Sequence, residues 1–424
     1  MKKLALLLVL ISLVVSGYQQ QPSLFGVSGI CHPLPTANPQ ELGMSTQKLN
    51  HITEVMQKHI DQKRMAGMVA VAARYGKIAY FEALGRQDMK KKTPMRKDSI
   101  FWIASMSKPI TSVAVMMLYE EGKFALNEPV SNYLPVFADM EVGVEKKDET
   151  EGKVTYSTVP VEREVTILDL LRHTSGLGYG DGDTEMDKRY RKAMDTDENV
   201  PLAEWVGRLR SVPLKFQPGT RWEYGISTDV LERLVEVVSG MSFDRFFEER
   251  IFGPLGMKDT AFYVPDAKRD RLATLYSPGY VFNEDKEEPK KQDLKNLDMT
   301  LKPSPVMDES YFGKSVKRLS GGGGLVSTAG DYLRFCQMLL NNGELDGVRI
   351  LKKETVALMT RDHIGNIPKL DWMQDAFGLG FRIHDTSQDG PSKGTYRWGG
   401  SCEHQVLDRP ERRTYNDIYD TNHS

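Results

Sequence analysis

Phe101-Trp102-Ile103-Ala104-Ser105-Met106-Ser107-Lys108-Pro109 is the stretch from which the fold and the chemistry of this chain are read. Ser105 and Lys108 are three residues apart, so on a helix their side chains lie on the same face, about one turn apart. A serine hydroxyl is a weak nucleophile by itself, and a lysine amine kept neutral by burial can accept its proton. Apolar residues recur at helical spacing from Ile110 to Leu118, and Gly122 ends the pattern. We therefore expect Ser105 to be a nucleophile and Lys108 its base.

The same spacing occurs a second time, from Ser45 to Lys48, so the pattern alone is not specific. Ser45 stands before apolar residues at helical spacing, which is typical of the N-cap of a helix over residues 45–64. Ser45 is therefore interpreted as a structural residue. Ser105 needs support from other parts of the chain.

Length, charge and cysteine content limit the class of protein. The chain has 424 residues, 40% of them hydrophobic, enough for one large domain or two smaller ones. Its formal net charge of −2 predicts no general attraction to nucleic acid or to a membrane surface. Cys31, Cys336 and Cys402 are odd in number and far apart, so no disulfide framework is expected. Cys336 falls in a helical pattern and is expected in the core.

The first residues are typical of a secretory signal. Met1-Lys2-Lys3 precede the apolar run from Leu4 to Val15, and the small residues Ser16 and Gly17 follow. We expect a signal peptide over residues 1–17 and a periplasmic or secreted protein; an uncleaved anchor is the alternative. No later stretch approaches the ~18 apolar residues of a membrane span, so none is expected in the mature chain.

The order of the elements predicts an α/β (α+β) fold. After a Pro- and Gln-rich linker at residues 18–43, β-rich runs at 68–75 and 78–84 flank a hairpin turn. A long middle with helical patterns follows, and strand patterns return at residues 377–383 and 394–398. The charged residues 141–164 are expected to form a solvated loop. This order predicts a body with an all-helical domain inserted at about residues 101–314.

Further motifs follow Ser105 in order along the chain. They are His173-Thr174-Ser175-Gly176-Leu177, Pro218-Gly219 before Tyr224, a helix over 229–240, Gly323-Gly324-Leu325-Val326-Ser327-Thr328 and Trp398-Gly399-Gly400. Together with Ser-x-x-Lys, this set resembles the serine β-lactamase and penicillin-binding-protein superfamily over residues 44–400, and class C β-lactamases and their esterase relatives in particular. The resemblance implies a hydrolase with an antiparallel sheet flanked by helices.

The resemblance also implies roles for individual residues. Ser105 becomes acylated, Lys108 holds or accepts its proton, and Tyr224 passes a proton to the leaving group. The backbone N–H groups of Ser105 and Ser401 form the oxyanion hole. His173 is expected to shape the pocket floor rather than act as a triad base, and a core tyrosine is the alternative for Tyr224. The other pocket residues implied are Trp398, Gly399 and Gly400.

Other chemistries lack their motifs. The chain has no Gly-x-Ser-x-Gly elbow, no His-Glu-x-x-His and no Cys or His cluster, so neither a metal site nor a cofactor is expected. From a different class of function, a non-catalytic penicillin-binding-like module that recognises cell-wall peptide stays open.

Two departures from the family pattern concern the substrate. Ile226 stands where β-lactamases have an Asn, and Trp398 replaces a Lys that binds an anionic group of the substrate. Losing one charge-assisted contact weakens binding by roughly 1.5–3 kcal/mol. A small neutral ester is therefore the expected substrate, so the protein is interpreted as a carboxylesterase-like enzyme. A β-lactam or a cell-wall peptide, cleaved by a β-lactamase or a D-alanyl-D-alanine carboxypeptidase, is the alternative.

The third departure is the tail at residues 401–424. It has few apolar residues and no alternation, so no buried strand is expected there. Codons permitted for residues 402–424, read one base later, can encode ASTKFWIDPKEELTMIFMTQII, which alternates as strands do and looks like the family's usual ending. We hypothesise a frameshift near Gly400 that leaves an aberrant tail and exposes the sheet beside the pocket. An inactive product is the corresponding alternative.

Overall fold

The computed structural model describes most of the chain from residue 33 onward. The described residues are 33–147, 154–194, 200–278, 300–304, 312, 317–370, 372–385 and 392–400, and the backbone of 405–409 and 414–420. The expected signal peptide, Cys31, Ser401 and Cys402 lie outside them. Within these ranges, no helix is both long and apolar enough to cross a membrane.

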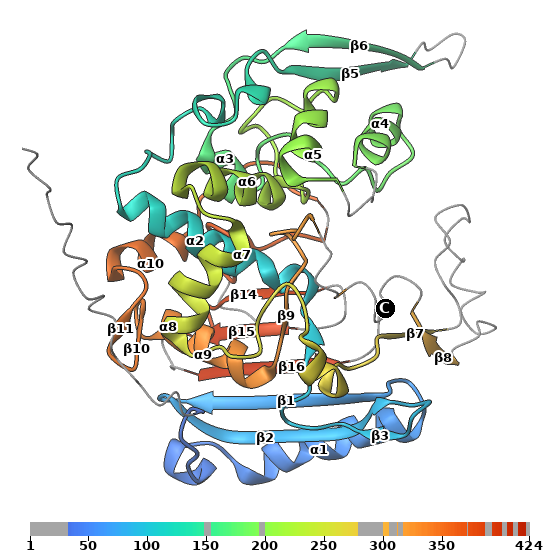
Figure 1. Ribbon diagram of the computed structural model, residues 1–424, viewed down its shortest axis with the longest axis vertical. Coiled ribbons are helices and arrows are strands. Elements are labelled where there is room, and N and C mark those ends of the chain that lie inside the picture. Colours follow the sequence, from blue (N-terminus) through green and yellow to red (C-terminus); the bar gives the residue numbers. More distant parts are fainter. Residues whose placement is uncertain are drawn as a thin grey trace, which may run out of the picture. The chain divides into compact units, whose positions relative to one another are not determined.

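Along the described chain, strands lie mainly near the two ends and the helices α3 to α8 follow one another in the middle (Figure 1). The α-helices are α1 (Thr46–Asp61), α2 (Ser107–Glu120), α3 (Ile167–Leu171), α4 (Glu185–Ala193), α5 (Leu202–Arg208), α6 (Ser227–Ser239), α7 (Phe243–Phe247), α8 (Gly253–Leu255), α9 (Ala329–Leu340) and α10 (Lys353–Met359). The strands are β1 (Gly67–Arg74), β2 (Lys77–Asp88), β3 (Thr93–Pro94), β4 (Phe101–Trp102), β5 (Glu141–Lys147), β6 (Val154–Pro160), β7 (Tyr276–Pro278), β8 (Leu301–Pro303), β9 (Val326–Ser327), β10 (Glu344–Leu345), β11 (Val348–Arg349), β12 (Ala376–Phe377), β13 (Arg382–Ile383), β14 (Tyr396–Gly399), β15 (Gln405–Arg409) and β16 (Thr414–Asp420).

The main sheet has the order β12-β13-β14-β15-β16-β1-β2-β3, with antiparallel neighbours throughout. Its strand β1 is buried on both faces. Alternate side chains of a strand point to opposite sides, so β1 contributes to two clusters. Met68, Ala70 and Ala72 pack with Leu49 of α1, whereas the residues between them belong to the main core, which also holds α2 and α9. The expected strands at 68–75 and 78–84 are confirmed.

Helix α1 begins as its sequence predicts. The backbone N–H of Lys48 donates to the Ser45 hydroxyl over 3.3 Å, so Ser45 is the N-cap of this helix. Cys336 of α9 is buried, as its position in a helical pattern predicts. Both observations confirm that helical spacing alone identified these elements.

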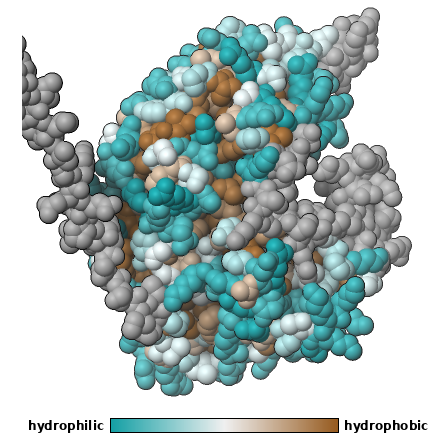
Figure 2. Space-filling model, in the orientation of Figure 1, coloured by the Kyte–Doolittle hydropathy of each residue, from teal (hydrophilic) through white to brown (hydrophobic). Residues whose placement is uncertain are grey.

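The inserted part contains strands as well as helices, so the all-helical expectation was wrong. In Figure 1, α3, α4, α5 and α6 lie on one side of α2, and the β5–β6 hairpin lies beyond them. β5 and β6 pair over the whole of both strands. They replace the loop expected at 141–164, because β-branched residues favour strands even where most of the side chains are exposed. On the face shown in Figure 2, hydrophobic residues gather mainly over this helical part.

Residues 33–43 are part of the domain rather than a linker. Leu34 and Leu42 are buried, and Thr36 forms a β-bridge with Ile78 of β2. The 3-10 helix η1 (Pro39–Leu42) is capped by Asn38, whose side chain accepts from the Gln40 backbone N–H. The Pro and Gln content of this segment predicted a linker, although two of its leucines are buried.

The tail forms two strands, although its sequence pattern predicts no buried strand there. β15 and β16 fill the space between β14 and β1 and complete the sheet. Strand pairing uses backbone N–H and C=O groups, which every non-proline residue carries whatever its side chain. The vacant edges of β14 and β1 therefore accept a chain whose pattern predicts no strand. The frameshift itself stays a prediction.

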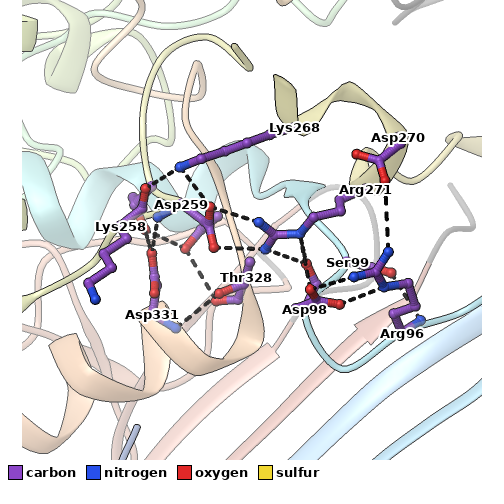
Figure 3. Close-up of polar contacts among 12 residues, drawn as sticks. Arg96, Asp98, Ser99, Lys258, Asp259, Lys268, Asp270, Arg271, Thr328 and Asp331 are labelled. Atoms are coloured by element: carbon purple, nitrogen blue, oxygen red, sulfur yellow. Dashed lines mark hydrogen bonds and ion pairs between the residues drawn. The ribbon is translucent and has the colours of Figure 1, made fainter. Parts of the chain in front are cut away.

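A buried carboxyl ties the start of α9 to the segment that follows α8 (Figure 3). Asp331 accepts from the Asp259 backbone N–H over 2.6 Å and from the Thr260 hydroxyl over 3.1 Å. Asp259 in turn forms ion pairs with Lys268 at 2.9 Å and with Arg271 at 2.7 Å. Burial raises the pKa of Asp331 to about 6 from 3.8, and the charge of Asp259 acts in the same direction.

We expect Asp331→Asn to change how stability depends on pH. The folded state holds the Asp331 proton more tightly than the unfolded chain, so this stabilisation is full below about pH 4 and is lost as the pH rises through about 6. The variant keeps an acceptor and cannot ionise. Relative to wild type, its free energy of unfolding should rise by about 3 kcal/mol between pH 4 and pH 7.

Urea unfolding at a series of pH values measures this difference. Asp266→Asn is the control, because the Asp266 side chain is 94% exposed. Parallel curves for Asp331→Asn and wild type would show that Asp331 does not hold a proton in this range.

Candidate active site

Ser105 and Lys108 lie together at the start of α2. Ser105 is in the 3-10 turn η2 (Ala104–Met106), and Lys108 is the second residue of the helix. The Lys108 Nζ is 3.3 Å from the Ser105 Oγ, and only 1% of Lys108 is exposed. Ala104, which precedes the serine, has a φ of 44°, a strained value for a residue with a Cβ. Such strain is common where a side chain must be presented for chemistry, and here it lies beside the Ser105 hydroxyl.

A glycine-rich turn anchors the lysine from the opposite side. The Lys108 Nζ donates to the Gly322 carbonyl over 2.6 Å. The Gly322 backbone N–H donates to Asp229 over 3.2 Å, and a Cβ at Gly322 would come within 2.5 Å of that carboxylate. Glu232 accepts from the Gly321 backbone N–H. Two acids of α6 therefore position the turn that positions the lysine, and the glycine run serves close packing.

Tyr224 and Tyr179 enclose the lysine amine. The Lys108 Nζ lies 4.7 Å from the ring centroid of Tyr224 and 5.6 Å from that of Tyr179. The Tyr224 hydroxyl is buried and has no hydrogen-bond partner. A buried unpaired hydroxyl is costly. The alternative considered from the sequence, a core tyrosine, would have a hydrogen-bonded hydroxyl. Gly225 is required after Tyr224, because a Cβ there would lie 2.3 Å from the Leu177 carbonyl oxygen.

His173 lies behind Tyr224 in an aromatic cluster. Its ring centroid is 5.2 Å from that of Tyr224 and 5.7 Å from that of Phe377. Burial, together with the charge of Lys108, lowers the pKa of His173 to about 3, so the ring is neutral at physiological pH. Its backbone carbonyl accepts from the Glu223 N–H over 3.0 Å. His173 was expected to shape the pocket floor, whereas it is not among the described residues that line the cavity beside Ser105 and instead supports Tyr224 from behind.

The third motif contributes an indole to the same cluster. Trp398 of β14 is 8% exposed, and its ring centroid lies 5.3 Å from that of Tyr224. Gly399 ends the strand, and Gly400 follows it. Ser401, the expected second oxyanion donor, lies outside the described residues, so its role stays a prediction. The structure therefore places an aromatic ring, and no cation, at this position.

Ser105 opens onto a cavity of about 230 Å³ between η2, the glycine run and the helical part. Its aromatic and aliphatic wall is made by Trp102, Tyr179, Met194, Trp205 and Ile226. Asp229 and Arg318 also line it. His173 and Trp398 are not among the described residues that line this cavity. Both lie beyond Tyr224. The cavity is the space that a substrate of Ser105 can occupy.

Sequence reasoning missed four residues around Ser105. Tyr179, Asp229, Glu232 and Arg318 were given no role, although each contacts the lysine, its glycine turn or the cavity. Asp229 and Glu232 are three apart on α6, a spacing that predicts a shared face. Arg318 stands three residues before Gly321, the first residue of the glycine run, where a cation is a detectable signal. The partners of these residues come from distant parts of the chain.

Comparisons with known proteins agree with this geometry. A sequence model of the Beta-lactamase family matches residues 52–415. The chain belongs to the Beta-lactamase family. It is 31% identical to esterase EstB of Burkholderia gladioli, over 82% of this chain and 84% of that protein. It is 30% identical to lovastatin esterase of Penicillium rubens, over 73% of this chain and 72% of that protein.

A solved structure within the family shows the same fold. EstCE1, described as a hydrolase with promiscuous acyltransferase activity, superposes with a TM-score of 0.71 at 25% identity, over 89% of this chain and 94% of that chain. Membership of the Beta-lactamase family, with esterases among the relatives, makes this chain a serine hydrolase. It also confirms the mixed α/β fold.

Proposed function

We propose that this chain is an exported carboxylesterase that works through an acyl-enzyme on Ser105. The observation that carries the proposal is the contact of the Lys108 Nζ with the Ser105 Oγ at the edge of a mostly apolar cavity. The Ser105 oxygen attacks the ester carbonyl carbon while its proton passes to Lys108. The C–O bond to the alcohol then breaks, and the alcohol leaves with a proton delivered through Tyr224.

Water completes the cycle. It attacks the acyl carbon and gives up a proton to the same side chains, and the carbon–Oγ bond breaks to release a carboxylic acid and free Ser105. The backbone N–H groups of Ser105 and Ser401 would hold the negative oxygen that develops at each step. The buried hydroxyl of Tyr224, which has no hydrogen-bond partner of good geometry among the described residues, supports its role in proton transfer.

Two residues favour an ester over a β-lactam. Ile226 lines the cavity where β-lactamases have an amide, and Trp398 packs on Tyr224 where they have a lysine. A substrate carboxylate at the Trp398 position would lose its charge-assisted contact, worth roughly 1.5–3 kcal/mol. The esterases among the relatives support the same preference.

We expect p-nitrophenyl butyrate to be cleaved with a kcat/KM at least about tenfold above that of a chromogenic cephalosporin, in line with one lost charged contact. Release of p-nitrophenolate and opening of the cephalosporin are measured on the same preparation. Equal or faster cleavage of the cephalosporin would favour a β-lactamase. Binding of cell-wall peptide without labelling by a fluorophosphonate would favour the non-catalytic module.

Export is proposed from the first residues of the chain. The two lysines and the apolar run that follows support a signal cleaved near Gly17 and a periplasmic location in a bacterium. Mass spectrometry of the mature N-terminus from a periplasmic extract tests this. A full-length N-terminus found in the membrane fraction would indicate an uncleaved anchor.

A further inference from the structure

A positive charge without a partner lies in the cavity that contains Ser105. Arg318 lines this cavity, and its Nη1 is buried without a hydrogen-bond partner. Its guanidinium carbon lies 5.1 Å from the ring centroid of Trp205. The Trp205 Nε1 is also buried and unpaired. Two residues that line the cavity therefore each carry a buried donor without an acceptor among the described residues, which is rare in folded proteins.

The nearby acids do not use this charge. Asp229 lines the same cavity, but its carboxylate accepts from Ser320 and from the Gly322 N–H, and no ion pair links it to Arg318 among the described residues. Burial, together with the charge of Asp229, raises the pKa of Glu232 well above its usual value, and the opposing charge of Arg318 is the smallest of the effects on it. The guanidinium is thus left to attract an anion from outside.

We propose that Arg318 and Trp205 bind an anionic group on the substrate, so that the preferred ester carries a carboxylate at the end of an apolar spacer. This inference rests on the proposed esterase function and names its substrate class. The aliphatic and aromatic wall formed by Met194, Tyr179 and Ile226 would contact the spacer. Guanidinium groups recognise carboxylates through paired N–H donors, and the indole N–H adds a third.

The proposal agrees with the loss of the cation at Trp398. Trp398 lies beyond Tyr224, in the cluster with Phe377, and it does not line the cavity. The two positions therefore contact different parts of a bound substrate. Binding of a substrate anion is disfavoured beside Trp398 and favoured beside Arg318. An ester with its carboxylate near Arg318 would therefore bind better than a β-lactam, whose carboxylate would lie near Trp398.

The test compares two esters of one length. One is mono-p-nitrophenyl glutarate, which carries a free carboxylate, and the other is its methyl ester, which is neutral. We expect wild type to prefer the charged ester. Arg318→Gln should lower kcat/KM for the charged ester by about 10- to 100-fold and leave the neutral ester within about twofold, whereas Arg318→Lys should keep part of the preference. Arg210→Gln is the control. Arg210 follows Trp205 closely in the sequence, but its side chain is exposed.

Protection from labelling gives the same comparison without turnover. Glutarate should slow labelling of Ser105 by a neutral fluorophosphonate in wild type and not in Arg318→Gln, and an unprotected labelling rate equal to that of wild type shows that the variant is folded. Equal loss on both esters, or no loss on either, overturns the anionic subsite and leaves the esterase intact. Absence of both turnover and labelling in wild type overturns the proposed function instead.

Discussion

Ser105→Ala is expected to abolish ester hydrolysis, with kcat/KM for p-nitrophenyl butyrate falling by about 10⁴-fold or more, the range found when a serine hydrolase loses its nucleophile. The physical reason is that the Ser105 Oγ lies 3.3 Å from the Lys108 Nζ. Among the described residues, no other side-chain hydroxyl is hydrogen-bonded to this amine. Without the Oγ no acyl-enzyme forms, and a fluorophosphonate has no site to label. Intact mass after incubation with the probe measures the adduct directly.

The chain offers a matched control for this experiment. Ser45 has the same spacing to a lysine, but its hydroxyl caps α1. Ser45→Ala should leave both labelling and hydrolysis within about twofold of wild type while lowering stability by about 1 kcal/mol. An adduct that maps to a peptide without Ser105, or labelling that survives Ser105→Ala, would contradict the proposed mechanism.

The second large effect concerns the tail. Replacing residues 402–424 by ASTKFWIDPKEELTMIFMTQII is expected to raise the melting temperature by about 5 °C or more. The register of β16 on β1 pairs Val71 with Asp417, and paired residues share one face of a sheet. Val71 belongs to the main core, so Asp417 stands at a register position that faces the core, where an acidic residue is expected to be costly. The alternative string has an isoleucine at this position.

Calorimetry of the two full-length proteins measures the difference. Asp417→Ile should recover part of the increase, and Asp417→Asn, which removes only the charge, should recover less. A melting temperature that stays the same or falls would show that the present ending is the one that fits the sheet. The nucleotide sequence of the gene then decides whether the second reading frame exists.

Local patterns predicted several elements because they depend on neighbours along the chain. Helical spacing identified α1 and α9, and the hairpin around Gly76 identified β1 and β2. The pairing of Ser105 with Lys108 followed from the three-residue spacing together with the other motifs along the chain. Predictions failed where exposure or polarity concealed a strand, as in β5, β6 and β16, because backbone pairing tolerates side chains that propensity disfavours.

The sequence by itself determined the family, the Ser105-x-x-Lys108 motif and the ordered motifs that follow it, since each is written in adjacent residues. Only the tertiary structure showed that the Gly322 carbonyl holds the lysine, that Tyr224 keeps an unpaired hydroxyl, and that Arg318 stacks on Trp205 beside Ser105. Those contacts join residues separated by long stretches of chain. Which of them meet is decided by how the helices pack on the sheet, and no local pattern carries that information.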